Sequence, residues 1–357
     1  MLYIIDFHKK VLLCGMTAMG IALLYHAVYQ LVNIKENIYE YGGIMTMKTD
    51  RLSEGLSGRP VIFGEVLYDV FSDGKGVLGG APFNVAWNLK GFGLDPLFIS
   101  RVGEDIRGKE LEFAMENWEM DMSGLQKDPV KQTGEVEVAL AEDGTPSYSI
   151  MDDQAYDHID ENAALKATQA IDCSLIYHGS LIARSETSAG TLNSLLANTS
   201  VPSFVDANIR EPFSDNSMIE TSLERAKWAK LNKEELCSIL NIKNSQMNYQ
   251  AESRAFVASY KLDLLCLTLG ASGAFLTNAE RSLRAKPIYS GVIKDTVGAG
   301  DAFTAVVILG LSLGWDKINI LQRAIDFSVG VCGIQGAISR DKAFYQSYSA
   351  FWTESDV

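Results

Sequence analysis

The chain has 357 residues, of which 47% are hydrophobic and 21% are charged, and this composition excludes a fibrous or an intrinsically disordered protein. Its formal net charge of −14 at pH 7 would repel a phosphodiester backbone, so we do not expect nucleic acid as a partner. The five cysteines lie singly, which is typical of a protein in a reducing compartment. The four histidines lack zinc-like spacing, so no transition-metal site is expected.

Residues 1–58 differ from the rest of the chain. A basic start precedes an uncharged stretch over 11–34, which is long enough to span a bilayer or to serve as a signal sequence. Three interpretations stay open: a membrane anchor, a cleaved signal, and upstream sequence that is not part of the native protein. We favour the last, because Met45 and Met47 offer later starts just before a polar linker.

From Pro60 onward, short apolar runs alternate with helical patterns, which predicts an α/β fold with a largely parallel central sheet flanked by helices. Strands are expected at 61–63, 97–99, 174–178, 203–206, 228–231 and 264–269. Helices are expected from 84 onward and near 107–118, 188–197, 218–225, 233–240 and 252–260.

Two regions break this alternation. Residues 66–78 are short and rich in turn formers, and residues 134–150 alternate in polarity through a turn at Glu142-Asp143-Gly144-Thr145. The second pattern predicts an antiparallel hairpin. We therefore expect a small β lid, built from about 66–79 and 133–158, beside the parallel sheet.

The strongest chemical signal is the loop Asp295–Asp301 (DTVGAGD), which leads into an almost wholly apolar helix over 302–313. Free backbone N–H groups and the positive end of the helix dipole would converge at Gly298-Ala299-Gly300, where small residues let a phosphate approach. Asp301 would lie in the first turn and could accept a hydroxyl proton there. The alternative is a glycine turn whose carboxylate only stabilises the helix, and G-x-G-x-x-G fails because Phe303 holds the third glycine's place.

The segment D-T-x-G-A-G-D resembles the C-terminal signature of the ribokinase-like (PfkB-type) carbohydrate kinases. The resemblance covers nearly all of residues 60–340 and implies a Rossmann-like ribokinase fold that phosphorylates a sugar hydroxyl with ATP and Mg²⁺. It makes Asp301 the base and Gly298-Ala299-Gly300 the phosphate cradle. The segment Gly103–Glu110 nearly spells a P-loop, but Glu110 replaces the magnesium-binding Ser/Thr, and the segment is closer to the family's V-G-x-D-x-x-G.

On the sugar side, Gly64–Asp69 resembles the family's first strand, which implies that Asp69 binds sugar hydroxyls. Gly79–Ala86 resembles the N-terminal signature and implies that Gly80 and Asn84 contact the sugar, although Asn84 could also be a helix N-cap. Ala81-Pro82, in place of the lysine of ribokinases, resembles fructokinases.

Residues 205–210 follow a predicted strand and resemble the fructokinase D-x-N-x-R motif. Arg210 could orient a hydroxyl or a phosphate oxygen, or it could form a plain surface ion pair. Residues 134–157 also resemble a bacterial fructokinase branch, but Tyr156 replaces the tryptophan common there.

On the nucleotide side, Asn232 and Glu235 match the family's N-x-x-E motif, and their spacing places both on one helical face, suited to hydrated Mg²⁺. The alternative is a solvated helix start. The T-x-G-x-x-G segment implies three ATP-binding residues beside Asn232: Thr268, Gly270 and Gly273. Residues 327–339 would supply the adenine wall and, with Asp295, part of a monovalent-cation (K⁺) loop.

The expected organisation is therefore a leader over 1–58, a carbohydrate kinase domain over 59–345 and a tail over 346–357. We expect a cytoplasmic, fructokinase-like enzyme that dimerises through the β lid, with membrane attachment only if the leader is a real anchor. Kinases of 2-keto-3-deoxygluconate or of a nucleoside stay open as alternatives. A non-catalytic sugar-sensing module is the alternative from another class, and Asp301 argues against it.

Overall fold

The computed structural model describes residues 55–140, 146–210, 213, 216–287 and 292–354. These residues belong to one compact unit, which comprises 50–287 and 291–357. The stretch over 11–34 and the predicted turn at 142–145 lie outside the described residues. Within the described part of the chain, no helix combines the length and the apolar character that crossing a membrane requires.

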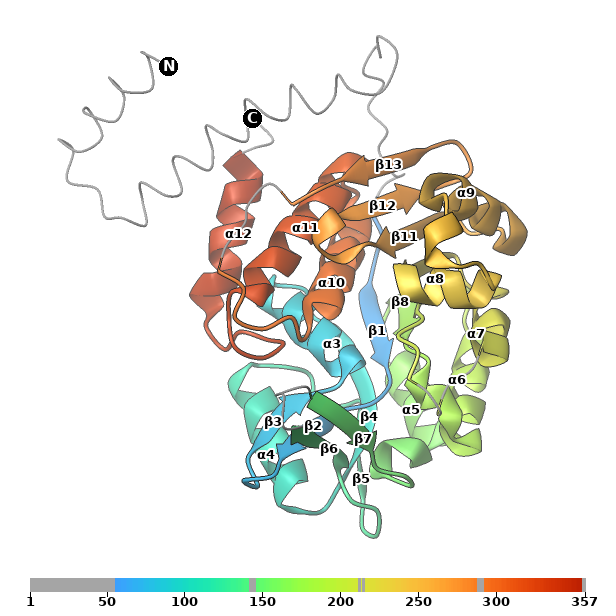
Figure 1. The fold of residues 1–357 in the computed structure, drawn as a ribbon. Helices are drawn as coiled ribbons and strands as arrows, with labels where there is room; N and C mark the ends of the chain where they lie inside the picture. Colours follow the sequence, from blue (N-terminus) through green and yellow to red (C-terminus); the bar gives the residue numbers. More distant parts are fainter. Residues whose placement is uncertain (1–54, 141–145, 211–212, 214–215, 288–291, 355–357) are drawn as a thin grey trace, which may run out of the picture. The chain divides into compact units, whose positions relative to one another are not determined.

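A nine-stranded sheet forms the centre of this unit, in the order β13-β12-β11-β10-β9-β8-β1-β4-β5 (Figure 1). Its strands from β5 to β11 in this order pair in parallel, and the edge strands β12 and β13 are antiparallel. The bounds are β1 Arg59–Phe63, β4 Leu97–Gly103, β5 Leu125–Asp128, β8 Cys173–His178, β9 Ser203–Asp206, β10 Trp228–Asn232, β11 Leu264–Thr268, β12 Ala274–Thr277 and β13 Ser282–Ala285. The predicted parallel α/β fold is confirmed, and the antiparallel edge was not predicted.

Helices cover both faces of the sheet (Figure 1). One face carries the largest core cluster, in which α10 packs against α3 and α11, and two smaller clusters lie on the other face. The helices are α3 Ala81–Gly91, α4 Ile106–Asn117, α5 Glu161–Gln169, α6 Glu186–Ala197, α7 Asn216–Leu223, α8 Lys233–Leu240, α9 Tyr249–Tyr260, α10 Ala299–Leu313, α11 Lys317–Cys332 and α12 Lys342–Glu354. Short 3₁₀ turns lie at η1 Ala155–His158, η2 Leu181–Arg184, η3 Asn244–Gln246 and η4 Gly270–Ser272.

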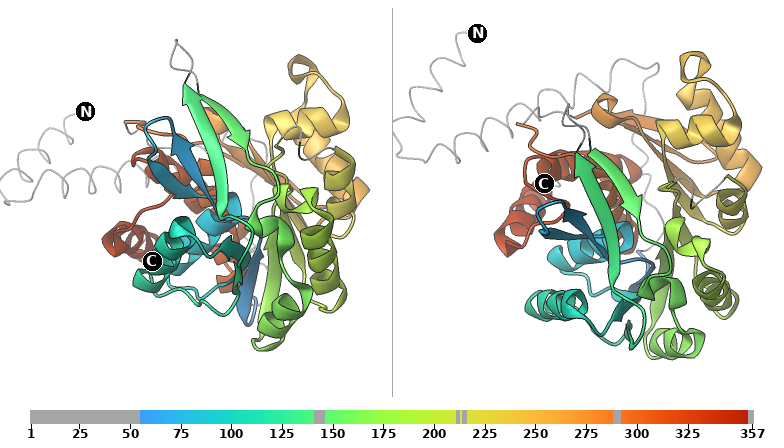
Figure 2. Two further views of the ribbon diagram at one scale, coloured as in Figure 1. Left: turned by 90° about the horizontal axis from the view of Figure 1, so that it is seen from below. Right: turned by 60° about the horizontal axis from the view of Figure 1, so that its bottom comes forward.

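A second, four-stranded sheet with the order β3-β2-β6-β7 lies beside α3 (Figure 2). Its strands are β2 Leu67–Phe71, β3 Gly76–Gly79, β6 Gly134–Leu140 and β7 Pro146–Ile150. β6 and β7 pair antiparallel, as the predicted hairpin requires, and β6 pairs in parallel with β2. The two predicted segments of the lid therefore form one sheet.

The C-terminal helix extends further than we predicted. We placed the end of the kinase domain at residue 345, but α12 runs on to Glu354. Trp352 is only 3% exposed and belongs to the main core cluster, and its carbonyl accepts a hydrogen bond from the buried Arg323. Residues 346–354 are thus part of the packed domain, because the aromatic residues of this helix cover apolar surface that α11 would otherwise expose to water.

Candidate active site

The predicted anion loop leads directly into a helix, as the sequence indicated. Gly298 is the N-cap of α10 and has a φ of 77°, which favours glycine. A Cβ added at Gly298 would lie 2.3 Å from the Cβ of Ala337, so the loop packs closely against the segment after α11. The amides at the start of this 15-residue helix have no partners within it, and they present the positive end of its dipole.

Asp301 lies in the first turn of α10, and the amide nitrogen Nδ2 of Asn84 donates to its Oδ2 over 2.8 Å. Burial raises the pKa of Asp301 to about 6, against the hydrogen bond from Asn84, which lowers it. The alternative role of Asn84 as an N-cap is wrong, because α3 begins at Ala81 and its N-cap is Gly80. Asn84 lies one turn inside the helix, and its side chain faces the predicted base instead.

A buried ion pair lies directly behind the loop. The Nζ of Lys230 contacts Oδ1 of Asp206 at 2.9 Å, and the hydroxyl of Thr304 donates to Oδ2 over 2.9 Å. A Cβ at Gly300 would lie 3.1 Å from the Lys230 Nζ. Burial disfavours the charged lysine, but Asp206 and Glu235 outweigh it and raise the pKa of Lys230, so the group stays protonated.

Two further acids from the predicted sugar-binding strand and its end have raised pKa values. Glu65 is 2% exposed, and burial raises its pKa to about 7. Burial likewise raises the pKa of Asp69 to about 6, and its Oδ2 would lie 3.5 Å from a Cβ added at Gly79. Arg210 lowers the pKa of all three acids, which places its charge among them. Arg210 is itself exposed, and its role toward the substrate stays a prediction.

A scan against protein-family models matches residues 41–342 to the pfkB family of carbohydrate kinases. The chain belongs to this family. It is therefore a sugar kinase, and the predicted ribokinase-like membership and enzyme class are confirmed.

Known proteins agree with this assignment. The chain is 28% identical over 293 residues to a fructokinase of Klebsiella pneumoniae, covering 78% of this chain and 92% of that protein. The crystal structure of an uncharacterized sugar kinase from Pyrococcus horikoshii in complex with ATP is 26% identical, with a TM-score of 0.66 over 78% of this chain and 93% of that one. A Vibrio cholerae fructokinase with bound fructose, ADP and calcium ion is 21% identical and shares the fold, with a TM-score of 0.68 over 82% of this chain and 98% of that one.

The N-x-x-E pair of this kinase forms a reciprocal cap at the start of α8. The backbone amide of Glu235 donates to Oδ1 of Asn232 over 2.8 Å, and the amide of Asn232 donates to Oε2 of Glu235 over 2.7 Å. Oε1 of Glu235 accepts from the amide of Ile209 over 3.1 Å. Glu235 is 6% exposed, so the alternative of a solvated helix start is wrong.

The remaining nucleotide-side residues have structural partners as well. Thr268 ends β11, Gly270 begins the turn η4 with a φ of 57°, and Gly273 follows this turn as its C-cap with a φ of 90°. A Cβ at Gly273 would lie 2.0 Å from the Ala285 carbonyl oxygen, so only glycine fits there. Asp295 accepts from the amides of Val297 over 3.0 Å and Gly336 over 3.1 Å, tying the anion loop to the segment after α11. Their roles toward ATP and K⁺ stay predictions.

Sequence reasoning missed Lys230, Thr304 and Glu65 as members of the site. A signal existed for the first two, because each is a polar residue inside an otherwise apolar strand or helix. Glu65 lies within the segment Gly64–Asp69, from which the resemblance implied a role for Asp69 alone. All three lie with residues far away in the sequence, such as Asp206 and Thr304, 98 positions apart.

Proposed function

We propose that the chain phosphorylates the primary hydroxyl of fructose with ATP, and that Asp301 is the catalytic base. The observation that carries this proposal is a carboxylate with a raised pKa in the first turn of α10, beside the glycine loop. A base whose pKa of about 6 lies just below neutral pH is ionised at pH 7 and still attracts a proton.

The geometry of the site supports a separate role for each residue in the transfer. Asn84 holds Oδ2 of Asp301, so Oδ1 can take the proton of the sugar hydroxyl. The resulting alkoxide oxygen attacks the γ-phosphorus of ATP, the bond to the β-phosphate bridging oxygen breaks, and ADP leaves. The amides at Gly298-Ala299-Gly300 would bind phosphoryl oxygens, and the buried Lys230 cation behind Gly300 would add favourable charge without direct exposure to water.

The residues fit a magnesium ion held chiefly by the nucleotide. Among the described residues, no group of three His, Cys, Asp or Glu side chains could hold a metal ion. Both carboxylate oxygens of Glu235 already accept backbone amides, which suits contact with Mg²⁺ through water better than direct ligation. Bound Mg²⁺ would neutralise charge on the triphosphate.

The charges of the site favour a neutral sugar. Glu65, Asp69 and Asp301 are three carboxyl groups near the guanidinium of Arg210. The two buried cations nearby, Arg184 and Lys230, already pair with Asp157 and Asp206. A phosphorylated or carboxylated sugar would meet this excess of acids unfavourably, while neutral hydroxyls can donate to carboxylates. Fructose is the first choice among neutral sugars because of the fructokinase-like Ala81-Pro82 and the similar fructokinases.

A second candidate is the sugar acid 2-keto-3-deoxygluconate. It is favoured by the position of Arg210 among the acids, since the planar guanidinium fork matches a carboxylate. The test is kcat/KM, with coupled detection of ADP, across fructose, ribose, 2-keto-3-deoxygluconate, adenosine and fructose 6-phosphate. We expect fructose first. A preference of about tenfold, or ~1.4 kcal/mol, for the keto acid or for the phosphorylated sugar would overturn the charge argument.

We also propose a cytoplasmic homodimer that pairs through the lid. The lid sheet has two edges, β3 and β7, at which a second copy could add strands. Light scattering of the purified chain tests it: a dimeric mass that becomes monomeric when an edge strand receives a proline supports the proposal, and a monomeric wild type contradicts it.

A further inference from the structure

Glu65 occupies a position at which α/β proteins bind ligands. It follows the central strand β1 by two residues, so it lies at the carboxyl end of a parallel strand. The backbone around it is fixed: a Cβ at Gly64 would lie 2.4 Å from Pro82, and a Cβ at Gly80 would lie 2.8 Å from the Glu65 carbonyl oxygen. The two glycines therefore let the start of α3 pack against Glu65, and its carboxyl group is held in place.

The carboxyl group has an unused hydrogen-bonding atom. Oε2 of Glu65 is buried and has no hydrogen-bond partner among the described residues, and the same is true of the hydroxyls of Tyr156 and Tyr177. Burial is the main cause that raises the pKa of each tyrosine, and the charge of Glu65 adds to it, so both rings lie near this carboxyl group. Three buried polar groups without partners in one place are unusual, because most buried polar groups are hydrogen-bonded.

Arg184, a buried cation whose charge acts on Glu65, forms its salt bridge with Asp157. Arg184 donates to both carboxylate oxygens of Asp157, over 2.8 and 2.6 Å, and to the carbonyl of Met151 over 2.8 Å. Its guanidinium also lies against the ring of Tyr156, 5.0 Å from the centroid. Nη1 of Arg184 is buried without a hydrogen-bond partner among the described residues, and the charge of Arg184 lowers the pKa of Glu65, but the salt bridge of Arg184 is made with Asp157.

We propose that Glu65 binds the sugar, accepting a hydrogen bond from a hydroxyl other than the one that Asp301 deprotonates. This inference rests on the proposed kinase function and deepens it. The charge of Asp301 acts on Glu65, so the two carboxyl groups are near each other, and Arg210 acts on both. A polyol with adjacent hydroxyls can reach both acids at once, whereas a substrate with a single hydroxyl cannot.

The experiment measures kcat/KM of the wild type, Glu65→Gln and Glu65→Ala with the sugar that the wild type prefers and with each of its monodeoxy analogues. We expect Glu65→Ala to lose about 10- to 100-fold in kcat/KM for the full sugar, the range for one hydrogen bond to a charged group. The KM for ATP should change less than about twofold, because the proposal assigns Glu65 to the sugar and not to the nucleotide. For one analogue, which lacks the hydroxyl bound by Glu65, the variants should lose no further activity.

The matched control is Asp128→Asn. Asp128 is a buried carboxylate whose oxygens already accept the amides of Val130 and Lys131 and pair with Arg101. It should show the same relative activity with every analogue, and thermal unfolding of all variants shows whether each is folded.

The outcomes separate the two proposals. Equal losses by the Glu65 variants with every analogue, in folded protein, would overturn the assignment of Glu65 and leave the kinase function intact. A wild type that turns over none of the sugars would overturn the proposed function, and the inference with it. Loss of effect with a single analogue supports both.

Discussion

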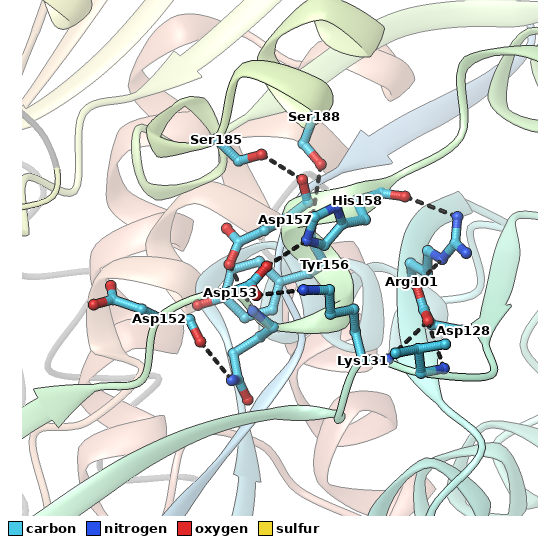
Figure 3. Close-up of polar contacts among 12 residues, drawn as sticks. Arg101, Asp128, Lys131, Asp152, Asp153, Tyr156, Asp157, His158, Ser185 and Ser188 are labelled. Carbon is cyan, nitrogen blue, oxygen red and sulfur yellow. Dashed lines mark hydrogen bonds and ion pairs between the residues drawn. The ribbon is translucent and has the colours of Figure 1, made fainter.

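Two clusters of acids, one at the candidate active site and one at the lid hinge, differ in the partners that surround their carboxyl groups. The hinge comprises the segments 129–133 and 151–158, which join the lid to the central sheet. In or directly beside these segments, Asp128 pairs with Arg101 at 2.9 Å and Asp157 pairs with Arg184. Asp153 contacts both Lys131 and the ring of His158 (Figure 3). At the candidate active site the charge of the exposed Arg210 lowers the pKa of Glu65, Asp69 and Asp301 alike.

The pKa values of Asp128 and Asp153 at the hinge shift in the opposite direction from those of the active-site acids. Hydrogen bonds from Lys131 and His158 lower the pKa of Asp153. Burial works against the charged form of Asp128, but the amides of Lys131 and Val130 and the charge of Arg101 outweigh it and lower its pKa. At the active site burial prevails, and the pKa of Asp301 rises to about 6. The paired acids of the hinge stabilise the fold. The acids of the active site have fewer partners, so their oxygens can accept hydrogen bonds from a substrate.

The largest expected effect is at the base. Asp301→Asn keeps the size of the side chain but cannot accept the proton, so kcat should fall by about 10²–10⁴-fold with the KM for ATP largely unchanged. Steady-state kinetics with coupled ADP detection measures it. Near-normal turnover would remove Asp301 from the mechanism.

A paired acid should instead affect stability. Asp157→Ala leaves the buried Arg184 without its carboxylate, which should lower the free energy of unfolding by about 3–5 kcal/mol. Urea denaturation followed by fluorescence gives the value. A loss of turnover without a loss of stability would show that the hinge acids act in catalysis, and the comparison between the clusters would fail.

The rate should depend on pH through Asp301. Burial raises the pKa of Asp301 to about 6 and that of Glu65 to about 7, so kcat/KM should be level only above about pH 8 and should fall about tenfold per pH unit or more below pH 6, as these acids become protonated. The Asp128→Asn variant should keep this profile. A profile that stays level down to pH 5 would contradict the raised pKa.

A smaller effect concerns the stability of the sugar-free protein. The pKa of Glu65 rises from 4.5 to about 7 on folding, so its contribution to stability is fully present below pH 4.5 and is lost as the pH rises through 7. Glu65→Gln removes this dependence, since glutamine stays neutral. The melting temperature of the variant relative to wild type should therefore be higher at pH 8.5 than at pH 5, and an equal difference at both would contradict it.

The parts that the sequence predicted are those that local pattern determines. The loop Asp295–Asp301 and the helix after it follow one another directly in the chain, and so do the strand and helix that Asn232 joins. The lid hairpin likewise follows from its alternating pattern. Such features need no knowledge of distant contacts.

The parts that it missed depend on tertiary packing. Lys230 contacts Asp206 behind Gly300 only because two strands that are separate in sequence pair in the sheet. Glu65 is buried only because the start of α3 at Gly80 packs against it. Desolvation, the main cause of the raised pKa of Glu65, is a property of the folded site and has no local signature. The extent of α12 was missed for the same reason, since its Trp352 packs against Phe92 and Trp315, which are distant in sequence.

The most direct measurement is the carboxyl titration of the sugar-free protein by ¹³C NMR, with resonances assigned by loss in Asp301→Asn, Glu65→Gln and Asp128→Asn. The account predicts that Asp301 titrates near pH 6 and Glu65 near pH 7, while Asp128 titrates below the ordinary aspartate value of about 3.9. If Asp301 and Glu65 titrated at or below the pH of Asp128, the distinction between the unpaired acids of the active site and the paired acids of the hinge would be wrong.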